Sequence, residues 1–283
     1  MGEAYARAGR HAAALKALEH ARTLQQDDWI CSYLIADVQS QTGHFTEAIK
    51  SLQSILGDRP SELGILIALS KAHLNSGAQE VALGFFARAE VSFLEAIEVA
   101  WKAMETNSGL SRVAWKIIAD SLFRYSSIRS PRETERLSDA LLTLKEILEA
   151  TPSIPISKPL VDSFIPEEIS ALNILDFAVA TYEYRISFRF HDDKAKASAF
   201  YDLGVALLTL RSRNVASHAT ITQDQVIGCL KEAVSAEPDE ESHWIALGDA
   251  YFLHNAKSAQ HAYIRSLELN SKVRTIPQHR NLY

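Results

Sequence analysis

The stretch HWIALGDAYFLHNAKSAQHAYIRSLELN, residues 243–270, decides the fold class of this chain. Its side chains at Trp244, Leu247 and Tyr251 recur at helical spacing, so they share one face of a helix. Gly248 on that helix lets a second helix approach closely, and the small Ala259 suits the point where the second helix crosses the first. The stretch therefore predicts two antiparallel helices, and its marker residues serve packing.

The same kind of unit recurs in the first third of the chain. Three sets of residues share an interval of 34, as 43−9 and 77−43: Gly9, Gly43 and Gly77; Ala14, Ala48 and Ala82; Leu18, Leu52 and Phe86. Each glycine is expected to close a first helix, and each alanine to be the small residue of a second helix. A pair of helices every 34 residues is typical of tetratricopeptide repeats, and the chain is identified as a member of that family.

The repeats predict an all-α protein, a right-handed α-α superhelix with irregular insertions. Residues 1–152 are expected to hold units one to four. The first of these lacks about six residues at its start, which indicates a piece of a longer array. Because the apolar phase continues from Ala82 to Met104, one long helix is expected from about 79 to 107. A proline-rich extended connector at 153–166 precedes an intervening helix, which is expected from Pro166 to about Phe190. Units five and six complete residues 167–270, and 271–283 form a tail.

Composition excludes several function classes. The formal charge of −6 argues against a mainly electrostatic nucleic-acid binder. No apolar run approaches the length of a membrane span, so no membrane contact is expected. Cys31 and Cys229 are interpreted as buried thiols in a reducing compartment, which favours the cytoplasm, with the nucleus as an alternative.

The chemistry of enzymes is not indicated by any motif. The eleven glycines form no phosphate loop, and neither a nucleophile elbow nor an H-E-x-x-H pattern occurs. We therefore expect no enzyme activity, no cofactor and no metal. His254 and His261 are separated by a turn and favour surface roles. The acids at Glu167 and Glu168 are typical of a helix start.

Two local features of the sequence each have two possible interpretations. Arg124, Arg129, Arg132 and Arg136 form a basic patch around an insertion in unit four; a solvated loop is favoured over a contact with RNA phosphates. The aromatic residues of the intervening helix, among them Phe177 and Tyr182, favour core packing over an exposed partner face.

The outward positions of the first helices are expected to line a groove that binds protein partners. These positions carry Tyr33, Asp37, Lys116, Asp120, Tyr201, Asp249 and Phe252. The mixed and rather acidic set favours a protein segment over RNA, because a phosphate track needs clustered cations. The lysine and asparagine clamp by which some repeats hold chaperone tails is not present, because the matching positions carry Tyr33 and Asp37 in unit two and Ile67, Ala68 and Lys71 in unit three.

A narrower resemblance rests on the order of four segments: WKIIAD at 115–120, FYDLG at 200–204, CLKEAVSAEPDEESHWIALG at 229–248 and AQHAYIRSLELN at 259–270. From about residue 100 to 270 the chain resembles the tetratricopeptide subunits of superkiller (Ski) complexes in their fungal form. The resemblance implies a non-catalytic scaffold that holds an RNA helicase and WD-repeat propeller subunits and supports exosome-dependent 3′-to-5′ cytoplasmic mRNA decay. RNA would be contacted only indirectly.

Two other classes are weighed against this one. The first is the non-catalytic repeat half of a glycosyltransferase, whose repeats are regular at 34 residues; the insertions after Tyr125 and Arg211 argue against it. The second is a solenoid that binds RNA directly through the loop from Arg124 to Arg136. Such a protein would show tight RNA binding that weakens steeply with salt.

Overall fold

A computed structural model describes residues 1–25, 28–128, 134–150, 154–162, 164–166, 169–213, 221–252 and 254–274. The chain divides into two units, of which the first comprises residues 1–147 and 164–181 and the second 148–163 and 182–283. All regular elements among the described residues are helices. The predicted fold class, an all-α superhelix of helix pairs, is confirmed.

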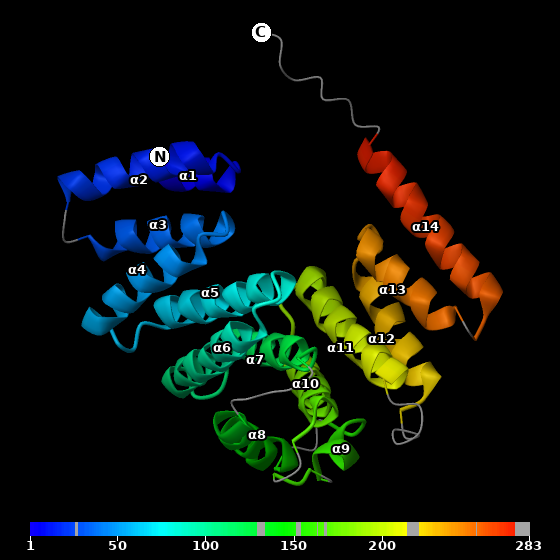
Figure 1. The fold of residues 1–283 in the computed structure, drawn as a ribbon. Coiled ribbons are helices and arrows are strands. Elements are labelled where there is room, and N and C mark those ends of the chain that lie inside the picture. The colour runs from blue at the N-terminus through cyan, green and yellow to red at the C-terminus, as the bar shows by residue number, and fades with distance from the viewer. Residues whose placement is uncertain are drawn as a thin grey trace. The chain divides into compact units, whose positions relative to one another are not determined.

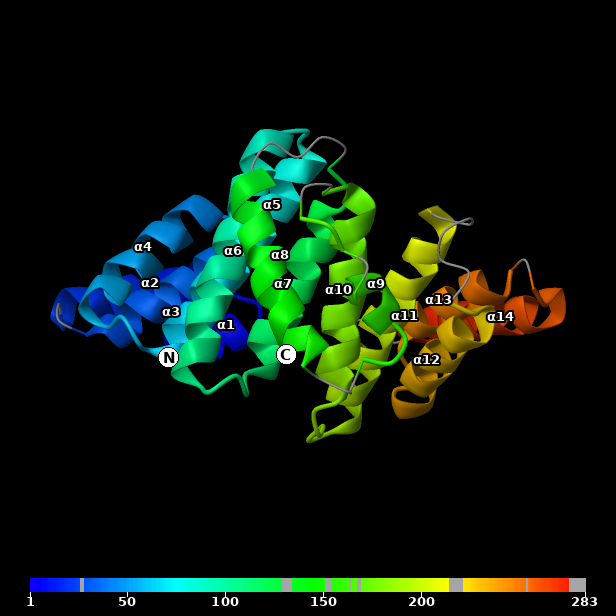
Figure 2. The ribbon, with the colours of Figure 1, turned by 90° about the horizontal axis from the view of Figure 1, so that it is seen from below.

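The first unit begins with two helix pairs of ordinary repeat length. They are α1 (Gly2–Arg7) with α2 (His11–Leu24), and α3 (Trp29–Gln41) with α4 (Phe45–Asp58). These helices pack side by side in chain order (Figures 1 and 2). Gly9 and Gly43 close α1 and α3 with positive φ, and Ala14 and Ala48 are fully buried, as the 34-residue interval predicts.

The third pair departs from that interval. It consists of α5 (Leu63–Ala82) and α6 (Phe86–Thr106), so the single helix predicted from about 79 to 107 is wrong. The chain turns between the two helices at Gly84, whose φ is +79°. Gly77 does not close a helix: it lies inside α5, where an added Cβ would come within 2.7 Å of the Phe93 ring. The buried small residue of the second helix is Ala89, because Ala82 is exposed at the end of α5.

The physical reason for the error is the length of the insertion. Helix α5 has 20 residues where α3 has 13, and α6 has 21 where α4 has 14. Seven residues are close to two helical turns of 3.6, so the apolar residues keep one phase from α5 into α6. Side chains link the longer pair: Ser70 Oγ donates to the Ala96 carbonyl at 2.6 Å, and Ser92 Oγ to Glu80 at 2.8 Å.

The first unit continues with α7 (Arg112–Tyr125), α8 (Thr134–Glu149) and part of α10 (Ala171–Ile186). The hydroxyl of Ser111 caps α7 by accepting from the Ala114 amide. The intervening helix, expected from Pro166, begins five residues later, because Ser170 and Asn173 bond to each other's backbone amides. Phe177 is fully buried and Tyr182 nearly so, in agreement with core packing.

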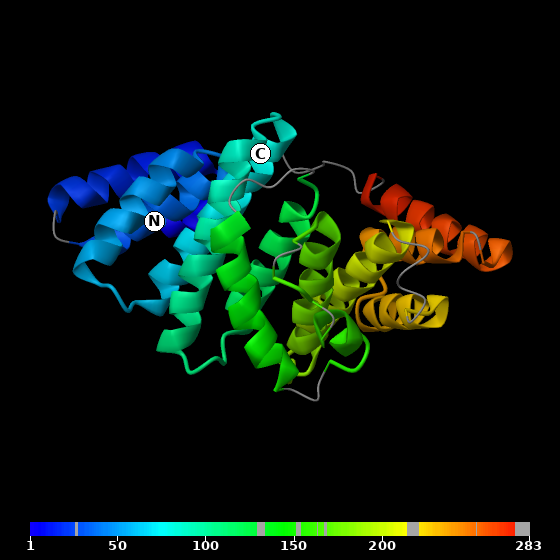
Figure 3. The ribbon, with the colours of Figure 1, turned by 60° about the horizontal axis from the view of Figure 1, so that its bottom comes forward.

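The second unit contains α11 (Asp193–Arg213), α12 (Gln223–Ala236), α13 (Glu241–Tyr251) and α14 (Ala256–Arg274), coloured yellow to red in Figure 3. Consecutive helices pack on one another, and α11 also contacts α13. Close approach is visible at two glycines. An added Cβ would lie 2.6 Å from Leu230 at Gly204 and 2.5 Å from Tyr263 at Gly248. The hairpin predicted for residues 243–270 is confirmed.

The connector is held by a buried carboxylate. Glu183, near the end of α10, accepts hydrogen bonds from the Ile156 amide at 2.9 Å and from the amide of Ser157 at 2.8 Å. Burial raises the pKa of Glu183, and these hydrogen bonds act in the opposite direction. The connector is not simply extended, because it contains the short helix α9 (Lys158–Asp162).

Candidate protein-binding surfaces

A groove lies on the first helices of the first unit. It encloses about 340 Å³ and is lined by mostly apolar side chains with two carboxylates: Glu3, Trp29, Ile30, Tyr33, Leu34, Glu62, Gly64 and Ile65. Trp29 and Tyr33 meet edge to face with ring centroids 6.4 Å apart. The guanidinium of Arg59 lies 4.8 Å from the Trp29 centroid. Size and polarity suit the groove to an apolar side chain of a partner.

Of the two residues predicted on α3, only Tyr33 lines this groove. Burial raises the pKa of its hydroxyl, and the nearby Asp37 carboxylate adds to the shift. Asp37 lies one turn further along and accepts a hydrogen bond from Gln41 Nε2 at 2.8 Å.

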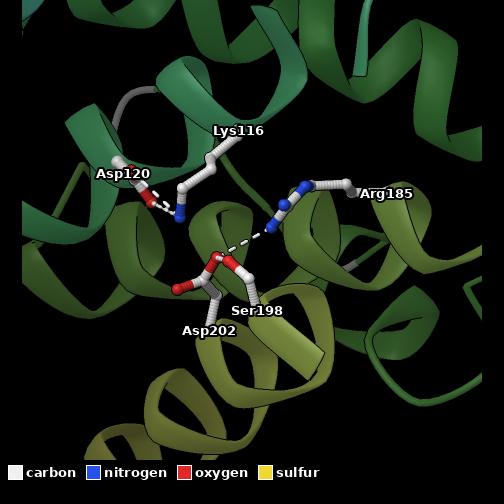
Figure 4. Close-up of polar contacts among 5 residues, drawn as sticks. All are labelled: Lys116, Asp120, Arg185, Ser198 and Asp202. Carbon is white, nitrogen blue, oxygen red and sulfur yellow. Dashed lines mark hydrogen bonds and ion pairs between the residues drawn. The ribbon is translucent and has the colours of Figure 1, made fainter. Parts of the chain in front are cut away.

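Lys116 and Asp120 lie one turn apart on α7 and pair with each other. The Lys116 ammonium is 3.4 Å from the Asp120 carboxylate, and both side chains are half-buried (Figure 4). A protein partner that uses either residue has to compete with this ion pair, which is weak at such exposure.

In the second unit, the structure brings two predicted residues together. Tyr201 on α11 and Asp249 on α13 come from helices that touch. The Tyr201 ring packs against His243 with centroids 5.0 Å apart. Burial raises the pKa of Tyr201; a hydrogen bond with Ser242 lowers it, and the carboxylates of Asp202, Glu240 and Asp249 raise it further. Of these three carboxylates, Glu240 and Asp249 are exposed, whereas the Asp202 side chain is only 15% exposed.

The end of α13 carries an exposed aromatic side chain. Phe252 follows α13 directly and is 64% exposed. Asp249, one turn earlier, is exposed and accepts a hydrogen bond from the Tyr263 hydroxyl at 2.7 Å. Burial, together with the hydrogen bond and the charge of Asp249, raises the pKa of Tyr263 to about 12. A carboxylate beside an exposed ring suits a segment with both basic and apolar side chains.

One ion pair was missed from the sequence. Arg185 Nη1 of α10 lies 2.7 Å from Asp202 Oδ2 of α11, and the two side chains are 9% and 15% exposed (Figure 4). Ser198 Oγ also approaches Asp202, at 3.4 Å. The two ionic residues are 17 positions apart on different helices, so no periodic pattern joins them. The pair joins the end of α10 to α11 within the second unit.

One arginine of the expected basic patch, Arg136, forms ion pairs with two glutamates. Arg136 at the start of α8 bonds to Glu98 at 2.7 Å and to Glu95 at 3.4 Å on α6. The hydrogen bond with Glu98 raises the pKa of Arg136 above its usual value. Arg124 is exposed, whereas Arg129 and Arg132 lie outside the described residues. A phosphate that binds Arg136 has to compete with these partly exposed ion pairs, as a partner does at Lys116.

The remaining predicted positions have ordinary surroundings. Cys229 is a buried free thiol, and burial raises its pKa to about 11; Cys31 is only half-buried, so the prediction of two buried thiols holds for one. His261 packs against the Trp244 ring. Glu167 and Glu168 lie outside the described residues. The described residues contain no cluster of three metal-ligating side chains, and none of their helices is both long and apolar enough for a bilayer.

These helix pairs define the class of the protein. A family model described as tetratricopeptide repeat matches residues 33–94, which run from α3 into α6. The prediction of tetratricopeptide repeats from the glycine and alanine spacing is confirmed by this match. Proteins of this architecture typically act in protein–protein interaction.

Two curated proteins and one solved structure are similar to this chain. Superkiller protein 3 of Schizosaccharomyces pombe is 27% identical over 265 residues, which cover 92% of this chain and 19% of that protein. Superkiller complex protein 3 of Mus musculus is 24% identical over 274 residues, 93% of this chain and 16% of that protein. A crystal structure of MamA shares 17% identity, with a TM-score of 0.44 over 85% of this chain and 96% of that one. The predicted resemblance to the superkiller subunit is confirmed. The chain spans about a fifth of the length of these curated relatives.

Proposed function

We propose that this chain is part of a non-catalytic scaffold in a superkiller-type complex that supports exosome-dependent 3′-to-5′ decay of cytoplasmic mRNA. The observation that carries the proposal is the similarity to superkiller protein 3 over 92% of the chain. By this resemblance, the partners are an RNA helicase and WD-repeat propeller subunits, and RNA is reached through them. The same resemblance favours the cytoplasm as the working compartment.

The surface chemistry supports a protein ligand. The face with Tyr201, Asp249 and Phe252 combines carboxylates with exposed aromatic area, which suits a basic and apolar protein segment. RNA phosphates would be repelled there. In the first unit, Arg136 pairs with Glu95 and Glu98, and RNA would have to compete with these carboxylates for one cation of the patch on which the rival RNA-binding function depends.

The test is purification of the protein from its source cells, with identification of the bound subunits. Asp249→Lys reverses an exposed charge, so we expect retention of the helicase to fall at least tenfold. Asp249→Asn keeps an acceptor for the Tyr263 hydroxyl and should give a smaller loss. Lys257→Glu, at an exposed site on α14, is the control and should leave retention unchanged.

Two outcomes would contradict the scaffold proposal. One is that no helicase or propeller subunit co-purifies with the unaltered protein. The other is that the pure chain binds RNA tightly with an affinity that falls steeply as salt rises, which is the behaviour of a direct RNA binder.

A further inference from the structure

Three turns in the first unit have the same backbone but different side chains. Gly9, Gly43 and Gly84 have φ values of 71°, 83° and 79°. The residues that follow them match closely in φ and ψ: Arg10 at −91° and 61°, His44 at −86° and 59°, Phe85 at −89° and 59°. The turn geometry therefore accepts arginine or histidine where the α5/α6 turn has phenylalanine.

The α5/α6 turn is apolar and exposed. Leu83 is 62%, Phe85 50% and Phe86 49% exposed. The corresponding turn between α3 and α4 places Thr42 and His44 where this one places Leu83 and Phe85. Because these apolar side chains are largely in water, the fold gains little from them. Leu83, Phe85 and Phe86 are called the apolar tip below.

Arg88 is the charged residue of the α5/α6 turn that lies beside the apolar tip. Between Glu80 and Glu90 the sequence has Arg88 as its single charged residue. Its guanidinium lies 5.2 Å from the Phe85 ring centroid and is exposed. A partner surface that covers the tip gains by offering a carboxylate to Arg88.

The exposed apolar area of the tip can be compared with the area of a protein interface. Two half-exposed phenylalanines and a leucine present on the order of 300 Å² of apolar area. A whole standard interface buries roughly 800 Å² on each partner, so the tip is large enough to form the centre of such an interface but not the whole of it. Aromatic and arginine side chains are enriched in protein interfaces relative to the rest of the surface.

We propose that the apolar tip inserts into an apolar pocket on a different protein, and that a carboxylate at the edge of that pocket pairs with Arg88. This contact is separate from the surfaces of the proposed scaffold function, since it lies on the turn between a first and a second helix. The longer α5/α6 pair carries the tip beyond the length of its neighbours.

The test places a photo-crosslinking phenylalanine analogue at position 86 of the whole protein in its source cells. We expect crosslinks to one stretch of a second protein, with an aspartate or glutamate nearby. The double variant Leu83→Thr, Phe85→His carries the residues of the α3/α4 turn. It should keep the melting temperature and lower the crosslink yield at least tenfold. Arg88→Glu should also lower the yield, and reversal of the partner's acidic residue should restore it.

Several results would overturn the proposal. They are crosslinks only to another copy of this chain, to another part of the same polypeptide or to lipid, no crosslink at all, or an unchanged yield in the double variant. Asp249→Lys should leave the tip crosslink unchanged. The crosslinking experiment can therefore succeed or fail independently of the proposed scaffold function.

Discussion

Two neighbouring helix pairs of the first unit follow the same plan at different lengths. Helices α3, α5 and α7 begin at residues 29, 63 and 112, so the step is 34 residues across α3/α4 and 49 across α5/α6. Both pairs turn at a glycine with positive φ, Gly43 in one and Gly84 in the other. Each arm of the longer pair gains seven residues, close to two helical turns. The comparison teaches that a repeat can lengthen without changing which helix face it buries.

The largest expected effect distinguishes two phenylalanines, Phe86 and Phe93, as the core residue of α6. A strict 34-residue interval assigns the core position to Phe86, but Phe93 is fully buried and Phe86 is 49% exposed. Phe93→Ala should lower the free energy of unfolding by about 3–5 kcal/mol, because it leaves a cavity beside Tyr125. Phe86→Ala should change it by less than about 1 kcal/mol. Urea titrations check both values, and equal losses would restore the strict interval.

A second prediction concerns Gly77, which the interval placed in a turn. Gly77→Ala puts a methyl group against the Phe93 ring, so we expect a loss of about 1–3 kcal/mol. Gly57→Ala is the matched control, because Gly57 lies within α4 with open space around its Cα; it should gain up to about 1 kcal/mol. Stabilisation by both substitutions in thermal melts would argue against the contact with Phe93.

The third prediction tests the turn itself. Gly84→Ala should cost about 1–2 kcal/mol, because a side chain at φ of +79° is strained. Gly43→Ala should cost about the same at +83°, and Gly84→Asn less, since asparagine tolerates this region. If α5 and α6 were one continuous helix, Gly84→Ala would instead raise the stability measured by chemical denaturation.

The smallest expected effect is a pH dependence in the longer pair. His73 of α5 occupies the position that Gln39 has in α3. Burial lowers the pKa of His73, and the Glu95 charge opposes this shift. Its folded pKa lies below the unfolded value near 6.5, so stability is complete above that value and is lost as pH falls through the folded pKa. His73→Gln should flatten the stability profile below pH 6.5. A profile that keeps its slope would show that other groups cause the dependence.

The candidate surfaces were predicted less completely than the fold. Helical spacing identifies which side of a first helix faces outward, and the partner-binding roles of Tyr33, Tyr201 and Asp249 stay predictions. It carries no information on pairing between helices, so the Arg185–Asp202 ion pair was missed. The contact of Arg136 with Glu95 and Glu98 was missed for the same reason, since 38 residues separate Arg136 from Glu98.

The sequence by itself determined the class of this protein and the positions of most of its helices. Local periodicity carries that information, because apolar residues at helical spacing and glycines at a fixed interval report contacts between adjacent helices. Only the tertiary structure decided where the third pair turns, because an insertion of two helical turns leaves the apolar phase unchanged. It also decided that Phe93, and not Phe86, fills the core, since burial depends on which residues of the opposing helix lie across from each position.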